Sequence, residues 1–147
     1  MPEYATNPRV NFDYEILETI EAGIVLEGHE VKAIKTGKAS IKGSYVKILN
    51  NEPFLIGATI SPYQPVNTPQ NYDPQRYRKL LLSKKEISRL LGLSQSQGLT
   101  IVPLKFYDKK SKIKLLVGVA KGKKKYDKRE TIKKKDVARA KQRGLEN

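Results

Sequence analysis

The first 120 residues consist mainly of short strand-like runs joined by turn signals, which restricts the chain to antiparallel β architectures. Residues 10–26 alternate apolar and polar side chains, with the period of a half-buried strand. Two more strand-like runs, 44–49 and 53–58, flank Asn50-Asn51, which signals a tight hairpin turn. Helices do not alternate regularly with these strands, so the βαβ order of a parallel sheet is excluded.

The second half of the chain continues this pattern. Residues 99–107 and 112–121 are β-rich and are separated by a short polar turn, so they predict a long hairpin. Gly23 interrupts the first strand-like run, which predicts a bulge or a close approach of another backbone. Residues 61–74 hold four of the eight prolines and therefore predict a long exposed loop.

Two segments have helical signals. Residues 27–37 place Val31 and Ile34 three positions apart and end at Gly37, which suits a helix C-terminus. Ser83 and Glu86 match a capping box, and the apolar residues that follow predict a helix beginning there.

These elements together predict a mainly β fold. We expect a small antiparallel barrel of the OB type, with five or six strands and two or three flanking helices. Residues 1–9 are polar and contain two prolines, so we expect them to fray. The predicted organisation is a flexible N-terminus at 1–9, a barrel at 10–121 and a basic tail at 122–147.

Positive charge is concentrated near the end of the chain. The net charge is +14, and residues 121–147 carry +8 of it in twelve Lys or Arg and four Asp or Glu residues. A cation near a phosphate releases condensed counterions, so this density favours a nucleic-acid partner. The tail also has too few apolar residues to fold alone, and it predicts disorder in the free protein.

Several other classes of protein do not fit the sequence. The chain has no cysteine, and we find no apolar run long enough for a membrane span and no signal peptide, so we expect a cytoplasmic protein. His29 is the single histidine, and Thr36–Ser40 resembles a P-loop end but has Lys32 where the motif needs glycine. We therefore expect no enzyme, no metal, no cofactor and no small-molecule substrate.

Three long motifs resemble one known family. EAGIVLEGHEVKAIKTGKASI, RKLLL-x-K-x-EI and GVAKGKKKYDKRETIKKKD closely resemble the SmpB family, in the same order, from about Tyr14 to about Asp136. The resemblance implies a six-stranded OB-like barrel with a C-terminal tail that is unstructured when free. It also implies binding to the tRNA-like domain of transfer-messenger RNA (tmRNA, or SsrA RNA) and its delivery to stalled bacterial ribosomes. The resemblance further implies that nascent chains on those ribosomes are then tagged for proteolysis.

The resemblance also assigns roles to individual residues. Glu21 matches an acidic position implicated in RNA contact, and Ser83 replaces the Asn or His common in relatives, which puts any RNA contact by that side chain in doubt. The residues predicted to bind RNA are Glu21, Lys32, Lys35, Arg78, Lys79, Leu81, Ser83, Lys121, Lys123 and Lys124. Tail residues predicted to contact the small-subunit decoding centre and the mRNA channel are Tyr126, Asp127, Lys128, Arg129, Lys133 and Lys134. In that channel we expect residues 131–143 to form a helix.

Two alternative functions are also compatible with the sequence. A general OB-type binder of single-stranded nucleic acid or ribosomal RNA would present several aromatic rings for base stacking. The candidate rings are Tyr14, Tyr45, Phe54, Phe106 and Tyr107. A polybasic membrane-surface protein would instead pair its cations with an amphipathic apolar face, of which the tail offers only Ile132, Val137 and Leu145.

Overall fold

The computed structural model describes residues 2–123, and the predictions for residues 124–147 lie outside this range. Its strands are β1 (Glu3–Thr6), β2 (Tyr14–Ile24), β3 (Ala39–Ser40), β4 (Tyr45–Leu49), β5 (Glu52–Ile56), β6 (Thr59–Ile60), β7 (Arg78–Leu81), β8 (Thr100–Lys109) and β9 (Lys112–Gly122). Its helices are α1 (Val10–Asp13), α2 (Gly28–Lys35) and α3 (Lys84–Gln97), with a short 3-10 helix η1 (Pro65–Asn67).

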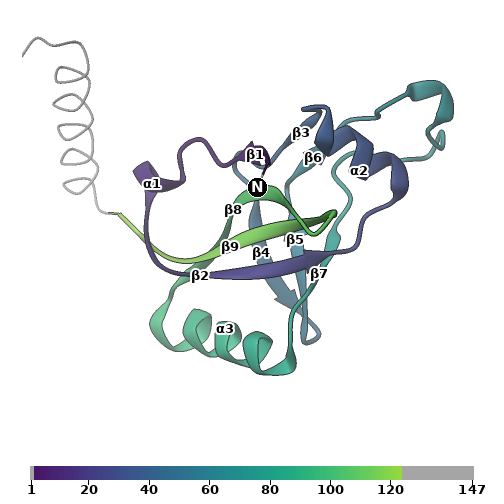
Figure 1. Cartoon of the computed structure of the whole chain (residues 1–147). Coiled ribbons are helices and arrows are strands. Elements are labelled where there is room, and N and C mark those ends of the chain that lie inside the picture. The colour runs from purple at the N-terminus through teal and green to yellow at the C-terminus, as the bar shows by residue number, and fades with distance from the viewer. Residues whose placement is uncertain (1, 124–147) are drawn as a thin grey trace, which may run out of the picture.

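Seven of the described strands form one curved antiparallel sheet (Figure 1). Its hydrogen-bonded order is β1-β8-β9-β2-β7-β5-β4, and β3 and β6 form a separate two-stranded sheet. The mainly β antiparallel class is thus confirmed. The described part of the chain has nine strands rather than six, because β1, β3 and β6 are short pairings without a strong sequence pattern.

The N-terminal segment differs from the sequence prediction. Residues 3–6 do not fray but form β1, which pairs with β8 through Ala5 opposite Phe106 and Thr6 opposite Lys105. The edge of β8 offers free backbone groups, and pairing with them offsets the loss of chain entropy. Residues 10–13 are a short helix rather than the start of the long strand, and Val10 is buried there.

The hairpin predictions are confirmed. Asn50 and Asn51 join β4 to β5 with φ angles of 51° and 63°, which asparagine tolerates well. A similar turn at Lys110 and Ser111, with φ angles of 51° and 66°, joins β8 to β9. Gly23 marks a close approach, because a Cβ there would lie 3.1 Å from the Leu81 Cβ on β7.

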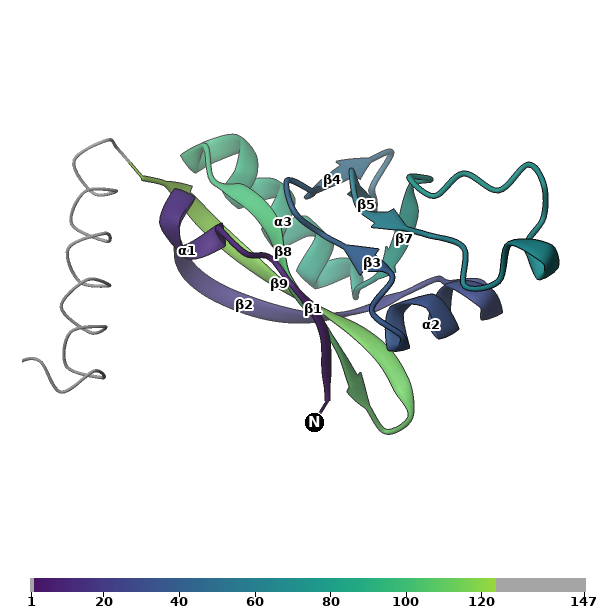
Figure 2. The ribbon, with the colours of Figure 1, turned by 90° about the horizontal axis from the view of Figure 1, so that it is seen from above.

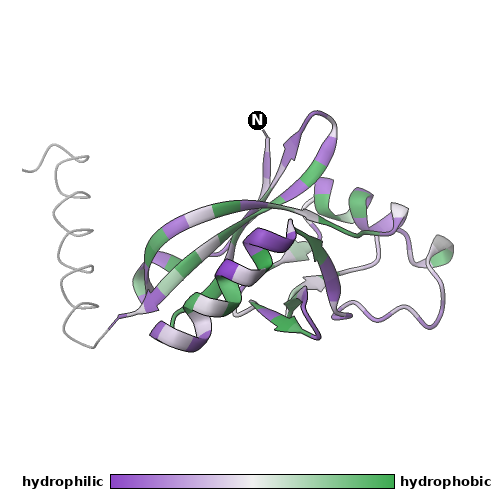
Figure 3. Cartoon of the chain, turned by 90° about the horizontal axis from the view of Figure 1, so that it is seen from below, coloured by the Kyte–Doolittle hydropathy of each residue, from purple (hydrophilic) through white to green (hydrophobic). Residues whose placement is uncertain are grey.

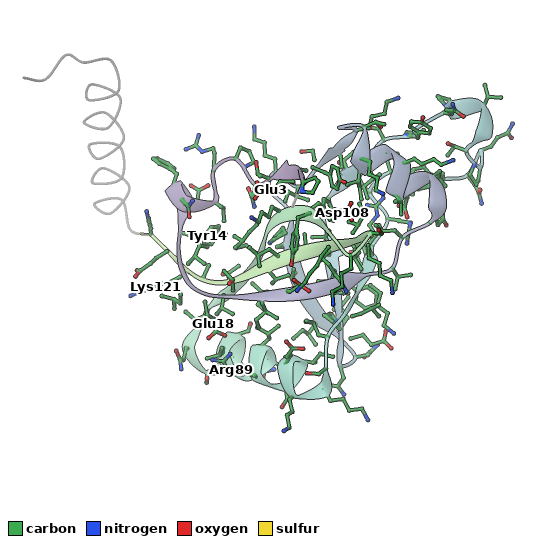
Figure 4. The ribbon with its side chains drawn as sticks, viewed as in Figure 1. Glu3, Tyr14, Glu18, Arg89, Asp108 and Lys121 are labelled. Carbon is green, nitrogen blue, oxygen red and sulfur yellow. The ribbon has the colours of Figure 1, made fainter. Side chains whose placement is uncertain are left out.

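Both predicted helices are present and flank the sheet (Figure 2). Ser83 caps α3 by accepting a hydrogen bond from the Glu86 N–H, and the Glu86 side chain reciprocates. Figure 4 shows Arg89 of α3 facing Glu18 of β2, and Arg89 Nη1 lies 2.5 Å from Glu18 Oε1. Gly37, just beyond α2, has a φ of 81°, as its predicted role at the helix end requires.

The core lies between the curved sheet and the inner sides of α2 and α3. Figure 3 shows apolar residues alternating with polar ones along the strands, and apolar residues gathered on one side of each helix. The fully buried core side chains come from every layer, including Ile34 of α2, Leu90 of α3 and Leu115 of β9. Burial of such side chains stabilises the fold by about 1.5–3 kcal/mol each.

Candidate nucleic-acid interface

Arg78 is the predicted RNA-binding residue whose position differs most from expectation. It begins β7, and its guanidinium is completely buried. Nε lies 3.0 Å and Nη2 2.8 Å from Glu30 Oε2, and Nη1 donates to the Ala58 carbonyl at 3.1 Å. The guanidinium therefore has no exposed surface in this structure, and its contact with RNA stays a prediction that this burial does not favour.

Glu30, on α2, is the centre of the buried cluster. Its carboxylate also accepts hydrogen bonds from Arg76, from the Tyr72 hydroxyl at 2.9 Å and from the Glu27 N–H at 2.9 Å. Burial alone would raise the pKa of Glu30, but the hydrogen bonds from Arg76, Glu27 and Arg78 outweigh it and lower the pKa to about 2. Glu30 therefore stays charged at any neutral pH.

This cluster joins three parts of the chain. Arg78 Nη2 donates to the Pro74 carbonyl at 2.9 Å, and the Tyr72 hydroxyl oxygen lies 2.8 Å from the Ile60 carbonyl oxygen. The proline-rich loop between β6 and β7 is thus fixed to α2 at its base. The sequence held two signals for this: Glu30 lies four residues before buried Ile34 on one helix face, and Arg78 shares its inward side of β7 with buried Leu80.

Glu21 occupies the outer side of β2, where it is oriented by two side chains of β8. The Tyr107 hydroxyl donates to Oε2, and Lys109 Nζ lies 3.1 Å from the same oxygen. The hydrogen bond from Tyr107, followed by that from Lys109, lowers the pKa of Glu21. About a third of the Glu21 side chain remains exposed, so the carboxylate can still accept a hydrogen bond from a partner.

Leu81 and Lys79 lie on the same outer surface as Glu21. Gly23, two residues beyond Glu21 on β2, pairs with Leu81 on β7. Leu81 is 55% exposed, so it is a surface residue rather than part of the core. Lys79 is also exposed and lies 3.5 Å from Glu52. An acid, an apolar side chain and a base therefore lie on neighbouring strands. We call these three residues, Glu21, Leu81 and Lys79, the β2–β7 surface.

The other predicted cations come from α2 and from the end of β9 and beyond. Lys32 and Lys35 are exposed on α2. Lys121 is exposed near the end of β9 (Figure 4). Lys123 is attached to α1, because its N–H donates to the Asp13 carbonyl at 2.9 Å and its Nζ donates to the Asn11 carbonyl at 2.6 Å.

The Ser83 hydroxyl accepts the Glu86 N–H at 3.2 Å, so its capping role is present, while its contact with RNA stays a prediction. Outside the described residues lie Lys124, Tyr126, Asp127, Lys128, Arg129, Lys133 and Lys134.

The aromatic residues give little support to a general single-strand binder. Phe106 and Tyr107 are buried, Tyr14 and Phe54 are half-buried, and Tyr45 is the exposed member of the five candidate rings. These five rings therefore do not form an extended exposed row on which successive bases could stack. Within residues 2–123 no cluster of three His, Cys, Asp or Glu side chains could hold a metal, and no helix is long and apolar enough to cross a membrane.

Comparison with known proteins identifies the family. The SmpB protein family model matches residues 4–147. The chain belongs to the SmpB family. An SsrA-binding protein of Anoxybacillus flavithermus is 52% identical over 96% of this chain and 91% of its own length. Another, from Acetivibrio thermocellus, is 53% identical over 92% and 87%.

A solved structure extends the likeness to three dimensions. It is described as "tmRNA-SmpB: a journey to the center of the bacterial ribosome", and its matching chain is 47% identical to this one. The TM-score is 0.66, over 82% of this chain and 84% of the other. The overall fold is therefore shared with a chain of that structure at substantial sequence identity.

Proposed function

We propose that this protein binds the tRNA-like domain of tmRNA and delivers it to stalled bacterial ribosomes for trans-translation. The observation that carries the proposal is membership of the SmpB family along nearly the whole chain, with relatives named SsrA-binding protein. The likeness to an SmpB chain in a structure described by tmRNA and the ribosome points the same way. The proposed role needs no covalent chemistry by the protein and places it in the bacterial cytoplasm.

The β2–β7 surface is our candidate for contact with the tRNA-like domain. Folded RNA is recognised by its shape, its 2′-hydroxyls and its backbone, which suits a rigid sheet. Lys79 supplies a cation for a phosphate, and Leu81 supplies apolar contact area next to it. Glu21 would be repelled by phosphates, so it fits a base amine or a 2′-hydroxyl that donates to its carboxylate.

Arg78 supports this surface from within. Its buried ion pair with Glu30 fixes the start of β7, on which Lys79 and Leu81 follow. A charged side chain that is fully hydrogen-bonded to protein positions its neighbours and does not itself meet the ligand. We therefore assign Arg78 as a positioning residue.

The basic end of the chain is assigned to the ribosome. A vacant mRNA channel is lined with phosphates, and the cations at 121–147 find partners there that an intact message would exclude. In this proposal Tyr126 stacks on a ribosomal base, and Lys128 and Arg129 contact phosphates. Asp127 then orients a neighbouring cation or favours a helix start. Lys121 and Lys123 lie where the sheet ends and the tail begins, so we assign them to neither partner alone.

Recovery of bound RNA from a bacterial lysate tests the proposal. The full-length protein, carrying an affinity tag at its N-terminus, is incubated with lysate, and the retained RNA is sequenced. We expect strong enrichment of tmRNA over tRNA and ribosomal RNA fragments. Uniform uptake of all RNA, equal to that of an unrelated protein of the same net charge, would instead support a general nucleic-acid binder.

A further inference from the structure

A pocket lies between α2 and the proline-rich loop, and none of its lining residues belongs to the β2–β7 surface. It has a volume of about 260 Å³ and is lined by Gly28, His29, Lys32, Tyr63, Gln64 and Thr68. In Figure 2 the loop between β6 and β7 extends past α2 and carries η1 at its far end. Pockets for drug-sized ligands usually measure about 300–1,000 Å³, so this one suits a smaller group, such as a single base or phosphate.

The loop wall of the pocket is held in place by its own hydrogen bonds. The Ser61 N–H donates to the Lys38 carbonyl at 2.9 Å, and Lys38 Nζ donates to the Tyr63 carbonyl at 3.1 Å. The Thr68 hydroxyl donates to the Gln64 carbonyl at 2.8 Å. The Glu30 cluster fixes the C-terminal part of the same loop at its base, through Tyr72, Pro74 and Arg76. The pocket is therefore formed before any ligand arrives, which lowers the entropy cost of binding.

The charge around the pocket favours an anion. Lys32 lines it, and Lys38 Nζ lies 5.9 Å from the centre of the Tyr63 ring. The nearby acids are already engaged, since Glu30 is buried among arginines and Glu27 contacts His29 Nε2 at 2.5 Å. An aromatic wall beside two lysines provides what a nucleotide needs, namely a flat apolar contact for the base and cations for its phosphate.

We propose that this pocket binds one unpaired nucleotide of the RNA partner, with the base against Tyr63 and the phosphate at Lys32 and Lys38. An acidic peptide would satisfy the lysines but would not use the aromatic wall. The inference rests on the proposed function and adds to it a second RNA contact, on the α2 side of the molecule. It also gives the proline-rich loop a role, that of a fixed wall for an extruded base.

Two variants and a matched pair of controls test the pocket. Lys38→Gln removes the cation and can keep the bond to the loop, and Tyr63→Leu removes the ring and keeps apolar packing. The controls are Lys47→Gln and Tyr45→Leu on β4, where both side chains are exposed. Each full-length variant binds a transcript of the tRNA-like domain of Anoxybacillus flavithermus tmRNA over a salt series, and thermal unfolding is measured in parallel.

We expect roughly tenfold weaker binding for Tyr63→Leu, the loss of one stacked base. For Lys38→Gln we expect a salt slope that is flatter by about 0.7–0.9, the loss of one phosphate contact. Both control variants should bind like the wild type. Wild-type affinity and salt dependence in both pocket variants would overturn the pocket while leaving tmRNA binding intact. No preference of the wild type for this transcript over a tRNA would contradict the proposed function itself.

Photocrosslinking keeps the test decisive if Tyr63→Leu fails to fold. The transcript carries 4-thiouridine at its unpaired uridines, and crosslinked peptides of the wild-type protein are identified by mass spectrometry. A crosslink within residues 61–68 or on α2 supports the pocket. Crosslinks confined to β2, β7 and β9 would show that the pocket does not meet the RNA.

Discussion

Nη2 of Arg78 lies 2.8 Å from Oε2 of Glu30, and neither side chain is exposed to solvent. Together with Arg76 and Tyr72, this pair connects α2, the proline-rich loop and the start of β7. A buried ion pair contributes little net stability when both partners are present, because each charge has lost its hydration. Its removal on one side is costly, since the other charge is then left buried without a partner.

Glu30→Gln should therefore destabilise the protein strongly at neutral pH. We expect a loss of about 3–5 kcal/mol in the free energy of unfolding, because two guanidinium groups lose their carboxylate. Urea unfolding followed by circular dichroism measures it. Glu52→Gln, which breaks the exposed pair with Lys79, should cost less than about 1 kcal/mol. Equal effects of the two substitutions would show that the buried cluster is not a stabilising junction.

The same carboxylate should make stability depend on acid pH. The pKa of Glu30 is about 2 in the folded protein and 4.5 in its ordinary state, so the unfolded chain binds its proton more tightly. The stabilisation is complete above pH 4.5 and is lost as the pH falls from 4.5 toward 2. The difference in stability between the protein with Glu30 ionised and with Glu30 protonated amounts to about 3 kcal/mol. Urea midpoints of wild type and Glu30→Gln, compared from pH 6 to 2.5, should converge toward acid pH; a constant difference would contradict this.

Substitutions of the neighbouring residues Arg78 and Lys79 should have different effects, the first on stability and the second on RNA binding. Lys79→Gln should leave the unfolding free energy nearly unchanged but flatten the salt dependence of RNA binding by about 0.7–0.9. Arg78→Gln should unfold the protein at lower urea, and any loss of RNA affinity should follow that loss of structure. Lys85→Gln, on the exposed side of α3, is the matched control for charge. The prediction fails if Lys79→Gln and Lys85→Gln bind the tRNA-like domain equally well.

Tyr107 should set the chemistry of Glu21. Tyr107→Phe removes one hydroxyl from a buried ring, so the pKa of Glu21 should rise toward its ordinary value. A less fixed carboxylate should also weaken binding to the tRNA-like domain several-fold. NMR titration of Glu21 and fluorescence anisotropy measure the two effects. Glu21→Gln tests the carboxylate directly, and Glu15→Gln on the same strand is its control, because it removes the same charge and should leave the affinity unaltered. If Glu21→Gln binds the tRNA-like domain as well as Glu15→Gln does, Glu21 is not part of the interface.

The tail should act in tagging rather than in tmRNA binding. Replacing Asp127-Lys128-Arg129 with alanine should leave the affinity for purified tmRNA nearly intact and abolish tagging in a reconstituted translation system. The reason is that two cations and their orienting acid are lost from the segment assigned to the ribosome. A scramble of residues 123–136 that preserves charge provides the control. Normal tagging by the scramble would mean that charge alone matters.

Local sequence signals predicted the elements well, and non-local pairings were the part that they missed. Asn50-Asn51 and the Ser83–Glu86 box act over a few residues, so their structures follow from backbone preference. β1 has no such signal, because it forms only by pairing with β8, which lies about a hundred residues later. Arg78 looked like a surface cation for the same reason: its partner Glu30 is 48 residues away.

The attachment of Lys123 to α1 has a consequence for how two partners can be bound at once. Its hydrogen bonds to Asp13 and Asn11 give the following residues 124–147 a fixed origin on the body. A chain spans at most about 3.3–3.6 Å per residue, so every later group lies within roughly 80 Å of that origin. Once the body is bound near a ribosome, the length of residues 124–147 sets the local concentration of the tail at a site within this radius. The amount of protein in the cell then no longer determines it.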